Sequence, residues 1–317
     1  MPLAPPFFSR GQAVHSRETI IIEGENGEWA EAAPLPGFSP DTIAEVLDDV
    51  RNRRMDATAC HSLQFARDCL SQNEWPKTEL PINALLDGPT ETVVEQARNI
   101  ARSRCRCVKL KVGRVAVQED IERVTLVRSL LRKEQSLRLD ANRAWDWDAA
   151  IEFGSAVAAL NIEYIEEPLA GTPDAAGSAE QLERWFGTTS CPYALDETVL
   201  DLFQMGDSDI TAETLGLYES VAALVIKPTL LGSIDRIQWL AEQNKPLVFS
   251  GCFESGVGTA QIARLAVRFS PGVPAGLDTH ARIASDLIKE ELIADDWVLR
   301  MNGAPDIDVK KLAELAK

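Results

Sequence analysis

Short apolar runs and longer helical patterns alternate along most of the chain. From about residue 80, runs of mostly apolar residues recur with starts about 25 to 30 residues apart. Between the runs, apolar residues recur every three or four positions, as they do from Ile121 to Leu131. A strand, a helix and another strand, repeated about eight times, are typical of a (β/α) barrel. The runs cover residues 80–86, 107–112, 137–140, 162–167, 193–197, 222–227, 246–250 and 275–278.

This pattern predicts an α/β fold: a (β/α)7-8 barrel of the TIM type with an N-terminal α+β capping domain. An open, doubly wound parallel sheet is the alternative. A GxGxxG phosphate loop would favour that sheet, but none follows the first strand of the repeat.

The first eighty residues follow a different pattern. A hairpin signal at residues 18–28 precedes a Pro/Gly-rich loop, and Ser39 and Pro40 predict a helix start, as N-cap and first helical residue. We expect residues 1–80 to form the capping domain, completed by about 290–317, and residues 81–289 to form the barrel.

Composition narrows the function classes. The chain has 317 residues and a net charge of −17, which argues against nucleic-acid and membrane-surface partners because both are anionic. No apolar run reaches the length of a membrane span, and the N-terminus lacks a signal-peptide pattern. The six cysteines lack disulfide or zinc spacing, so we expect reduced, mostly buried thiols in a cytoplasmic protein.

Charged residues stand where the predicted strands end. In a barrel these ends carry the chemistry. A single carboxylate there is often only a helix N-cap, but three acids on consecutive strands repel one another unless a cation binds them. Ligands that are all oxygen favour Mg²⁺ over zinc. Lys109 and Lys111 share one strand face, and we expect them to face the acids across the barrel axis. The strand-end residues are Lys109, Lys111, Asp140, Glu166, Asp196, Lys227, Ser250 and Asp278.

Five motifs carry a resemblance to a known family. They are VKLKVG, LRLDANRAW, IEYIEEPL, ALDET and VIKPTLLG, at residues 108–113, 137–145, 162–169, 194–198 and 225–232. In this order and spacing they resemble the muconate-lactonizing subgroup of the enolase superfamily.

The resemblance implies a role for each matching residue. The metal ligands would be Asp140, Glu166 and Asp196, holding Mg²⁺ with Mn²⁺ as a substitute. Lys111 would be the general base and acid, and Lys227 the opposing lysine. Lys109, Asn142 and Arg138 would support the site, and the adjacent acids Glu167 and Glu197 would turn away from the axis. The expected substrate pocket comprises Gly37, Phe38, Ser250, Gly251 and Ser255.

The implied reaction begins with removal of a proton from the carbon next to a substrate carboxylate. We expect a carbon–oxygen lyase that dehydrates a succinylated hydroxycyclohexadiene carboxylate. A racemase or epimerase of the same superfamily stays open, because it would use the same lysines. An inactive binding barrel is disfavoured, since all five ligand and lysine positions are filled. The expected partner is a small carboxylate substrate, and the expected state is a monomer.

Overall fold

The computed structural model describes residues 1–9, 12–72, 74–172, 174–204, 211–290, 292 and 296–315. Packing divides the chain into two compact units, each of which is described by itself. Unit 1 comprises Met1–Ile82, Ile226–Glu242 and Val248–Lys317, and unit 2 comprises Asn83–Val225 and Gln243–Leu247. The predicted boundaries, 1–80 with 290–317 and 81–289, stay a prediction.

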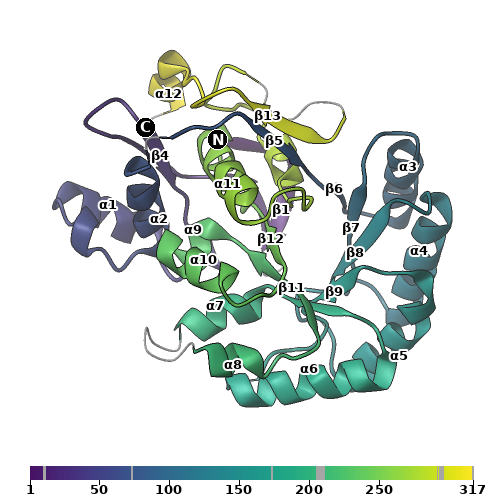
Figure 1. Ribbon diagram of the computed structural model, residues 1–317. Helices are drawn as coiled ribbons and strands as arrows, with labels where there is room; N and C mark the ends of the chain where they lie inside the picture. Colours follow the sequence, from purple (N-terminus) through teal and green to yellow (C-terminus); the bar gives the residue numbers. More distant parts are fainter. Residues whose placement is uncertain are drawn as a thin grey trace. The chain divides into compact units, whose positions relative to one another are not determined.

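Unit 2 contains most of the parallel sheet and its covering helices. The strands pair in chain order, each parallel to the next. Helices α3 to α6 pack in succession on the outer side of the strands (Figure 1). The elements are β6 (Ala84–Leu86), α3 (Thr90–Ala101), β7 (Cys107–Lys111), α4 (Val117–Leu130), β8 (Ser136–Asp140), α5 (Trp147–Val157), β9 (Tyr164–Glu166), α6 (Ala175–Thr189), β10 (Tyr193–Leu195), α7 (Glu197–Gln204), α8 (Ala212–Gly216) and β11 (Val221–Ile226).

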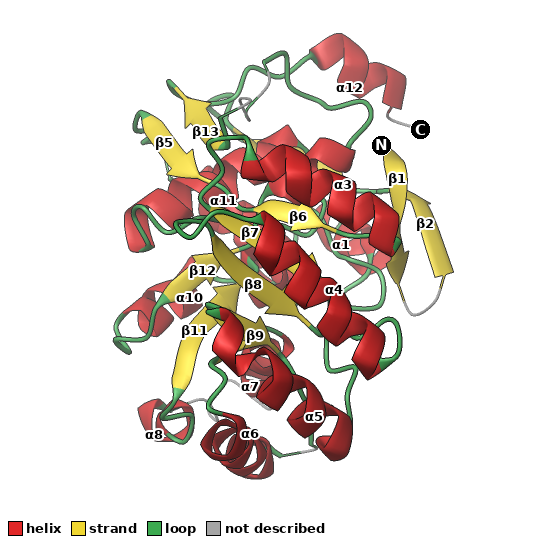
Figure 2. Ribbon diagram, turned by 90° about the vertical axis from the view of Figure 1, so that its right-hand side faces the viewer, coloured by secondary structure: helices red, strands yellow, loops and turns green. Residues whose placement is uncertain are grey.

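Burial explains why these strands are almost continuously apolar. All three residues of β9 and of β10 are buried, as expected for parallel strands that are covered on both faces. Helix α4 buries Val124 and Val127 together with Asp120 and Arg123, while Glu119 and Glu122 are exposed. Figure 2 shows α3, α4 and α5 as successive helices beside the strands.

The seven-stranded sheet has the order β6-β7-β8-β9-β10-β11-β12, with β12 at Leu247–Phe249. The eighth predicted run forms short parallel bridges: Gly276 pairs with Ser250 and Ala275 pairs with Ile82. Ser250 follows β12 in the chain and Ile82 precedes β6, and all four bridged residues belong to unit 1. The predicted α/β fold with repeated strand–helix units is confirmed.

Unit 1 combines short antiparallel pairs with helices. Its strands pair as β1 with β2, β3 with β4, and β5 with β13. The elements are β1 (Pro2–Ser9), β2 (Gln12–Ser16), β3 (Ile20–Glu23), β4 (Trp29–Ala32), α1 (Ile43–Arg51), α2 (His61–Leu70), β5 (Thr78–Pro81), α9 (Pro228–Leu231), α10 (Ile234–Ala241), α11 (Gly256–Phe269), β13 (Val298–Met301) and α12 (Val309–Leu315). Short 3₁₀ turns occur at Met55–Ala57 and Asp278–Arg282 here, and at Ala158–Leu160 in unit 2.

Two local predictions were wrong. Helix α1 begins after Thr42, whose side chain accepts from the Glu45 amide in a capping box, and not after Ser39. The Ser39 hydroxyl instead accepts from the Leu35 amide at 2.6 Å, which closes the preceding loop. The run at 80–86 also splits between β5 and β6, because Leu80 pairs with Leu299 in the antiparallel β5–β13 ladder.

Two predictions about composition can be compared with the structure. All six cysteines are free and buried, as expected. Among the described residues, no helix has both the length and the apolar character that a membrane crossing requires.

Candidate active site and metal site

Three acids of unit 2 meet at the carboxyl ends of neighbouring strands. Asp140 ends β8, Glu166 ends β9 beside it, and Asp196 follows β10. One carboxylate oxygen from each lies within 4.8 Å of the others. Each residue is only 1% exposed. The parallel register places these ends together, because it pairs Asp140 with Glu166 and aligns the carboxyl ends of neighbouring strands.

The electrostatics of this triad favour a bound cation. Burial raises the pKa of Glu166 to about 8, and the carboxylates of Asp140 and Asp196 add to the rise while Lys109 opposes it. Burial acts in the same direction on Asp140, but the ammonium groups of Lys109 and Lys111 outweigh it and hold the pKa of Asp140 below its ordinary value. Three buried carboxylates at this spacing offer the all-oxygen donor set that Mg²⁺ prefers. The residues therefore fit the ion.

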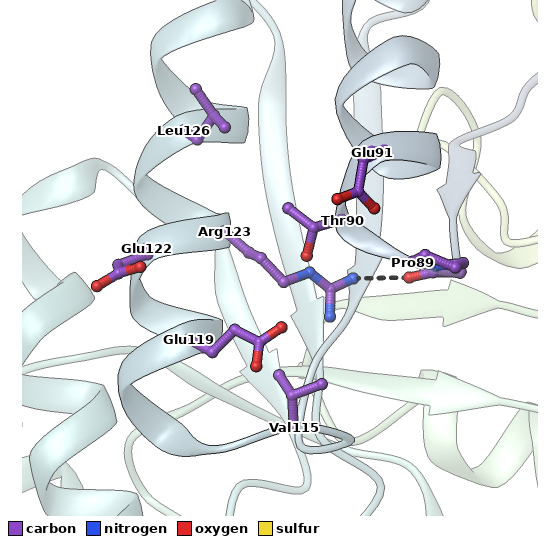
Figure 3. A pocket seen from close by; sticks show the side chains of 9 residues that line it. Pro89, Thr90, Glu91, Val115, Glu119, Glu122, Arg123 and Leu126 are labelled. Carbon is purple, nitrogen blue, oxygen red and sulfur yellow. Dashed lines mark hydrogen bonds between the residues drawn. The ribbon is translucent and has the colours of Figure 1, made fainter.

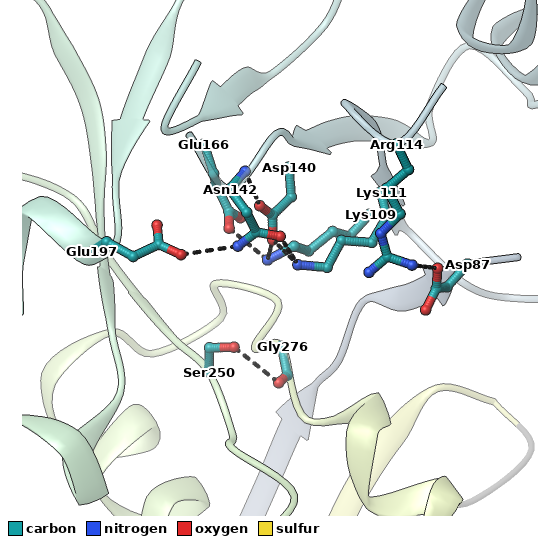
Figure 4. A network of polar contacts seen from close by, with 10 residues as sticks. All are labelled: Asp87, Lys109, Lys111, Arg114, Asp140, Asn142, Glu166, Glu197, Ser250 and Gly276. Atoms are coloured by element: carbon teal, nitrogen blue, oxygen red, sulfur yellow. Dashed lines mark hydrogen bonds and ion pairs between the residues drawn. The ribbon is translucent and has the colours of Figure 1, made fainter. Parts of the chain in front are cut away.

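Two lysines of β7 contact the triad directly (Figure 4). Lys109 Nζ lies 2.7 Å from Asp140 Oδ2 and 2.5 Å from Glu166 Oε2. Lys111 Nζ lies 2.6 Å from the same Asp140 oxygen. The lysines share a face because they are two residues apart on one strand. Both lysines contact Asp140 on the adjacent strand β8, and Lys109 also reaches Glu166 on β9, so they do not lie across the axis from these acids as expected.

Asn142 holds the amine of Lys111 from a second side. Its Oδ1 accepts from Lys111 Nζ at 2.6 Å, and its Nδ2 donates to Glu197 Oε1 at 2.9 Å. Its backbone has a φ of 44°, a left-handed conformation that Asn tolerates better than most residues, and its amide donates to Asp140 Oδ1. Lys111 is therefore oriented by a polar chain that runs through Asn142 to Glu197.

Glu167 joins the ends of three strands behind the triad. It is 2% exposed, and its Oε1 accepts from the amides of Asp196 and Thr198 at 2.8 and 2.7 Å. Its Oε2 accepts from Thr198 Oγ1 and from Arg143 Nε at 2.9 and 3.0 Å. Sequence reasoning missed Arg143 and Thr198. Their position two or three residues after a strand-end acid was the available signal.

The comparison with protein families decides the assignment. A family described as "Enolase C-terminal domain-like" matches residues 92–305. The chain belongs to the enolase superfamily. The resemblance that the strand-end motifs carry is thereby confirmed.

Relatives within the enolase superfamily include named enzymes. The o-succinylbenzoate synthase of Yersinia enterocolitica is 30% identical over 316 residues, which cover 92% of this chain and 91% of that protein. The structure of o-succinylbenzoate synthase from Thermosynechococcus elongatus, with Mg in its active site, has a TM-score of 0.69 at 24% identity and covers 87% of this chain and 90% of that one. The L-Ala-D/L-Glu epimerase of Bacillus subtilis has a TM-score of 0.76 at 19% identity, covering 96% and 94%. At these identities the two structures support the fold alone.

Arg138 makes an ion pair beside the enolase-type strand ends. Its Nε and Nη2 lie 3.0 and 2.9 Å from Glu163 Oε1, and its guanidinium lies 5.2 Å from the centre of the Tyr164 ring. These contacts fix the start of β9 against β8. A direct role for Arg138 in the site stays a prediction.

The other predicted site residues belong to unit 1. Lys227 directly precedes α9 and is half-buried. Ser250 donates to the Gly276 carbonyl at 3.3 Å, and Ser255 caps α11 by accepting from the Val257 amide. Gly37 has a φ of 85° in an exposed turn, and Phe38 follows it. The roles of these residues and of Gly251 stay predictions.

A separate hollow of about 530 Å³ lies in unit 2 and shares no residue with the acidic triad (Figure 3). It lies between the loop before α3 and the first turns of α4. Arg123 lines it and is only 5% exposed, with Nη2 donating to the Gly88 carbonyl at 3.2 Å and Nη1 lying 3.3 Å from Asp120.

Proposed function

We propose that the protein is an o-succinylbenzoate synthase, a carbon–oxygen lyase of menaquinone biosynthesis. The observation that carries the proposal is the buried triad of Asp140, Glu166 and Asp196, with Lys109 and Lys111 in direct contact with it. The related synthase of Yersinia enterocolitica, which aligns over nine-tenths of both chains, supports this activity in particular.

The chemistry begins with a proton that is very weakly acidic, on the carbon next to the substrate carboxylate. Bound by the triad, Mg²⁺ would supply positive charge that stabilises the enediolate. Lys111 takes the proton as a neutral amine, whose N–H groups Asp140 and Asn142 hold in place. The ammonium group so formed then returns a proton to the departing hydroxyl, so that the net change is loss of water.

The remaining predicted residues bind and orient the substrate. Lys227 would place a cation against the face opposite Lys111, where it stabilises the enediolate and the ring that becomes aromatic. Backbone amides near Gly251 would receive the succinyl carboxylate, with Gly37, Phe38, Ser250 and Ser255 completing the pocket. We further propose a cytoplasmic monomer whose partner is this small carboxylate, with Mn²⁺ able to replace Mg²⁺.

A second candidate activity is N-succinylamino-acid racemisation or dipeptide epimerisation. A racemase needs an acid–base group on each face of the substrate, and the expected pair Lys111 and Lys227 meets that need. The likeness to the Bacillus subtilis epimerase shows that the fold is compatible with it. The substrate pocket, and not the lysines, must therefore separate the two activities.

One experiment tests the proposal. Purified protein with Mg²⁺ and 2-succinyl-6-hydroxy-2,4-cyclohexadiene-1-carboxylate should form o-succinylbenzoate, followed by absorbance. Lys111→Ala and Lys227→Ala should each abolish turnover, whereas Lys133→Ala, at an exposed position, should not. No turnover by the folded wild-type protein would reject the synthase. Deuterium exchange into an N-succinylamino acid without any dehydration activity would favour the racemase.

A further inference from the structure

Glu254 is a buried carboxylate that takes no part in the chemistry above, yet it joins two segments that do. It lies between β12 and α11 and is 2% exposed. Its Oε1 accepts from Thr229 Oγ1 at 2.7 Å, and its Oε2 accepts from the Cys252 amide at 2.5 Å. Thr229 follows Lys227 by two residues, and Cys252 lies in the loop 250–255. All of these residues belong to unit 1.

The turn that carries Lys227 needs anchors from outside itself. Helix α9 is a single turn, Pro228–Leu231, closed by the Leu230 and Leu231 amides that donate to the Lys227 carbonyl. A single turn has too few hydrogen bonds to persist alone. His61 Nδ1 donates to the Leu230 carbonyl at 2.7 Å and so holds the far end of the turn. The Thr229 bond to Glu254 holds the end next to Lys227.

The loop on the other side of Glu254 is shaped around its carboxylate. Phe253 has a φ of 63°, a left-handed conformation that bulky residues rarely adopt and that persists only where neighbouring contacts hold it. The Cys252 amide is fixed by Glu254 just before this residue. A Cβ at Gly251 would lie 3.1 Å from Glu254 Oε2, so the loop passes close to the carboxylate. The loop conformation therefore depends on the carboxylate.

Capping of α11 does not require Glu254. Glu31 performs that task, because its carboxylate accepts from the amides of Ser255 and Gly258 at 3.1 and 2.9 Å. Ser255 itself caps the helix through its hydroxyl. The carboxylate of Glu254 is directed instead to Thr229 and Cys252. Its contacts are those of a link between the Lys227 turn and the loop.

We propose that Glu254 is a positioning residue: through Thr229 it sets the orientation of Lys227, and through the Cys252 amide it shapes the substrate loop. The proposal rests on the synthase function proposed above. Lys227 would act on the transition state and the loop on the bound substrate. The two contacts of Glu254 should therefore affect different kinetic constants.

The test uses the full-length protein with Mg²⁺ and the cyclohexadiene substrate. Thr229→Val replaces the hydroxyl with a methyl group and should lower kcat about tenfold, because a misplaced Lys227 weakens transition-state stabilisation. Its KM should stay within about twofold of wild type, because ground-state binding is unaffected. Thr229→Ser keeps the hydroxyl and should restore kcat. Thr189→Val, the same exchange at a buried Thr that bonds within α6, is the matched control.

Glu254→Gln supplies a second measurement. It weakens both contacts, so kcat should fall and KM should rise, by about threefold or more. Adding Thr229→Val to it should lower kcat by less than about twofold further, since both changes act on one bond. Fully additive losses, or a Thr229→Val enzyme with the kcat of the Thr189→Val control, would overturn the proposal.

A readout without substrate separates this proposal from the synthase function. Backbone hydrogen exchange of residues 227–232 and 251–255 should rise in both segments when Thr229 alone is changed to Val. If the wild-type protein lacks synthase activity but this coupled rise is found, the function is wrong and the link stands. Unchanged exchange in 251–255 would overturn the link even in an active synthase.

Discussion

Replacing Glu167 with Gln should weaken metal binding without changing any expected ligand. Glu167 accepts four hydrogen bonds, two of them from the backbone amides of Asp196 and Thr198. These two bonds hold the backbone at Asp196 and so set the direction of its side chain. A Gln side chain keeps the size but has an NH₂ group in place of one acceptor. That NH₂ must face the N–H groups of Asp196 and Thr198 or the guanidinium of Arg143. Either arrangement brings donors into contact with donors.

The magnitude follows from the contacts. A hydrogen bond to a charged group contributes roughly 1.5–3 kcal/mol, and breaking a buried ion pair costs about 3–5 kcal/mol. Arg143 is partly exposed and also pairs with Asp201 at 2.7 Å, so part of that loss is offset. We expect about 3 kcal/mol less free energy of unfolding. Groups that orient metal ligands typically change affinity by about 10- to 100-fold, and the same loss is expected for Mg²⁺.

Two assays check the prediction: urea unfolding of the metal-free protein and calorimetric titration with Mg²⁺. Glu183→Gln is the matched control, because Glu183 also accepts several hydrogen bonds. Their donors, Tyr193 and Ser220, lie at the amino ends of β10 and β11, whereas the triad lies at the carboxyl ends. The control should lose stability but keep its Mg²⁺ affinity. Equal Mg²⁺ affinity in the Glu167 and Glu183 variants would refute the reasoning.

Three further predictions concern single groups. Asn142→Gly preserves the left-handed backbone but removes the acceptor of Lys111, so kcat should fall about tenfold with little change in Tm. Burial raises the pKa of Asp286, but hydrogen bonds from His280 and two backbone amides outweigh burial and hold this pKa below its ordinary 3.8. The wild-type protein should therefore have a higher Tm than Asp286→Asn above pH 3.8, and this difference should disappear as the pH falls below 3.8. Burial raises the pKa of Cys69 and of Cys107 to about 12, so at pH 8 a thiol reagent should label the native protein at almost none of its six cysteines and the denatured protein at all of them.

The strand ends were predictable because two local signals coincide there. An apolar run fixes each strand, and a charge directly after it fixes the end, so Asp140, Glu166 and Asp196 could be grouped from sequence alone. The parallel register then brings the three acids together, since it aligns the carboxyl ends of neighbouring strands. Lys109 and Lys111 followed from strand alternation, although their direct contact with Asp140 did not.

The contacts that support the site were not predictable in the same way. Ser39 is a residue type that often caps helices, but its hydroxyl accepts a hydrogen bond from the Leu35 amide instead. Glu31 and Ser255 are 224 positions apart, and Thr229 and Glu254 are separated by a helix and a strand. No periodicity links such pairs. They exist because a buried carboxylate must find donors wherever the fold supplies them.

Magnesium itself should stabilise the protein, because the triad costs free energy until a cation binds it. A ligand that binds only the native state raises the free energy of unfolding by RT ln(1 + [L]/Kd), which is about 2.7 kcal/mol at 100 times Kd. For a chain of this size, that increase raises Tm by about 5 °C. Asp196→Asn should abolish that rise. Without metal it should unfold no more easily than wild type, since it removes a buried carboxylate whose repulsion helps to raise the pKa of Glu166. Scanning calorimetry with MgCl₂, against NaCl at equal ionic strength, separates the two effects. An equal rise in wild type and in Asp196→Asn would mean that Mg²⁺ acts elsewhere, and the assignment of the triad would have to be abandoned.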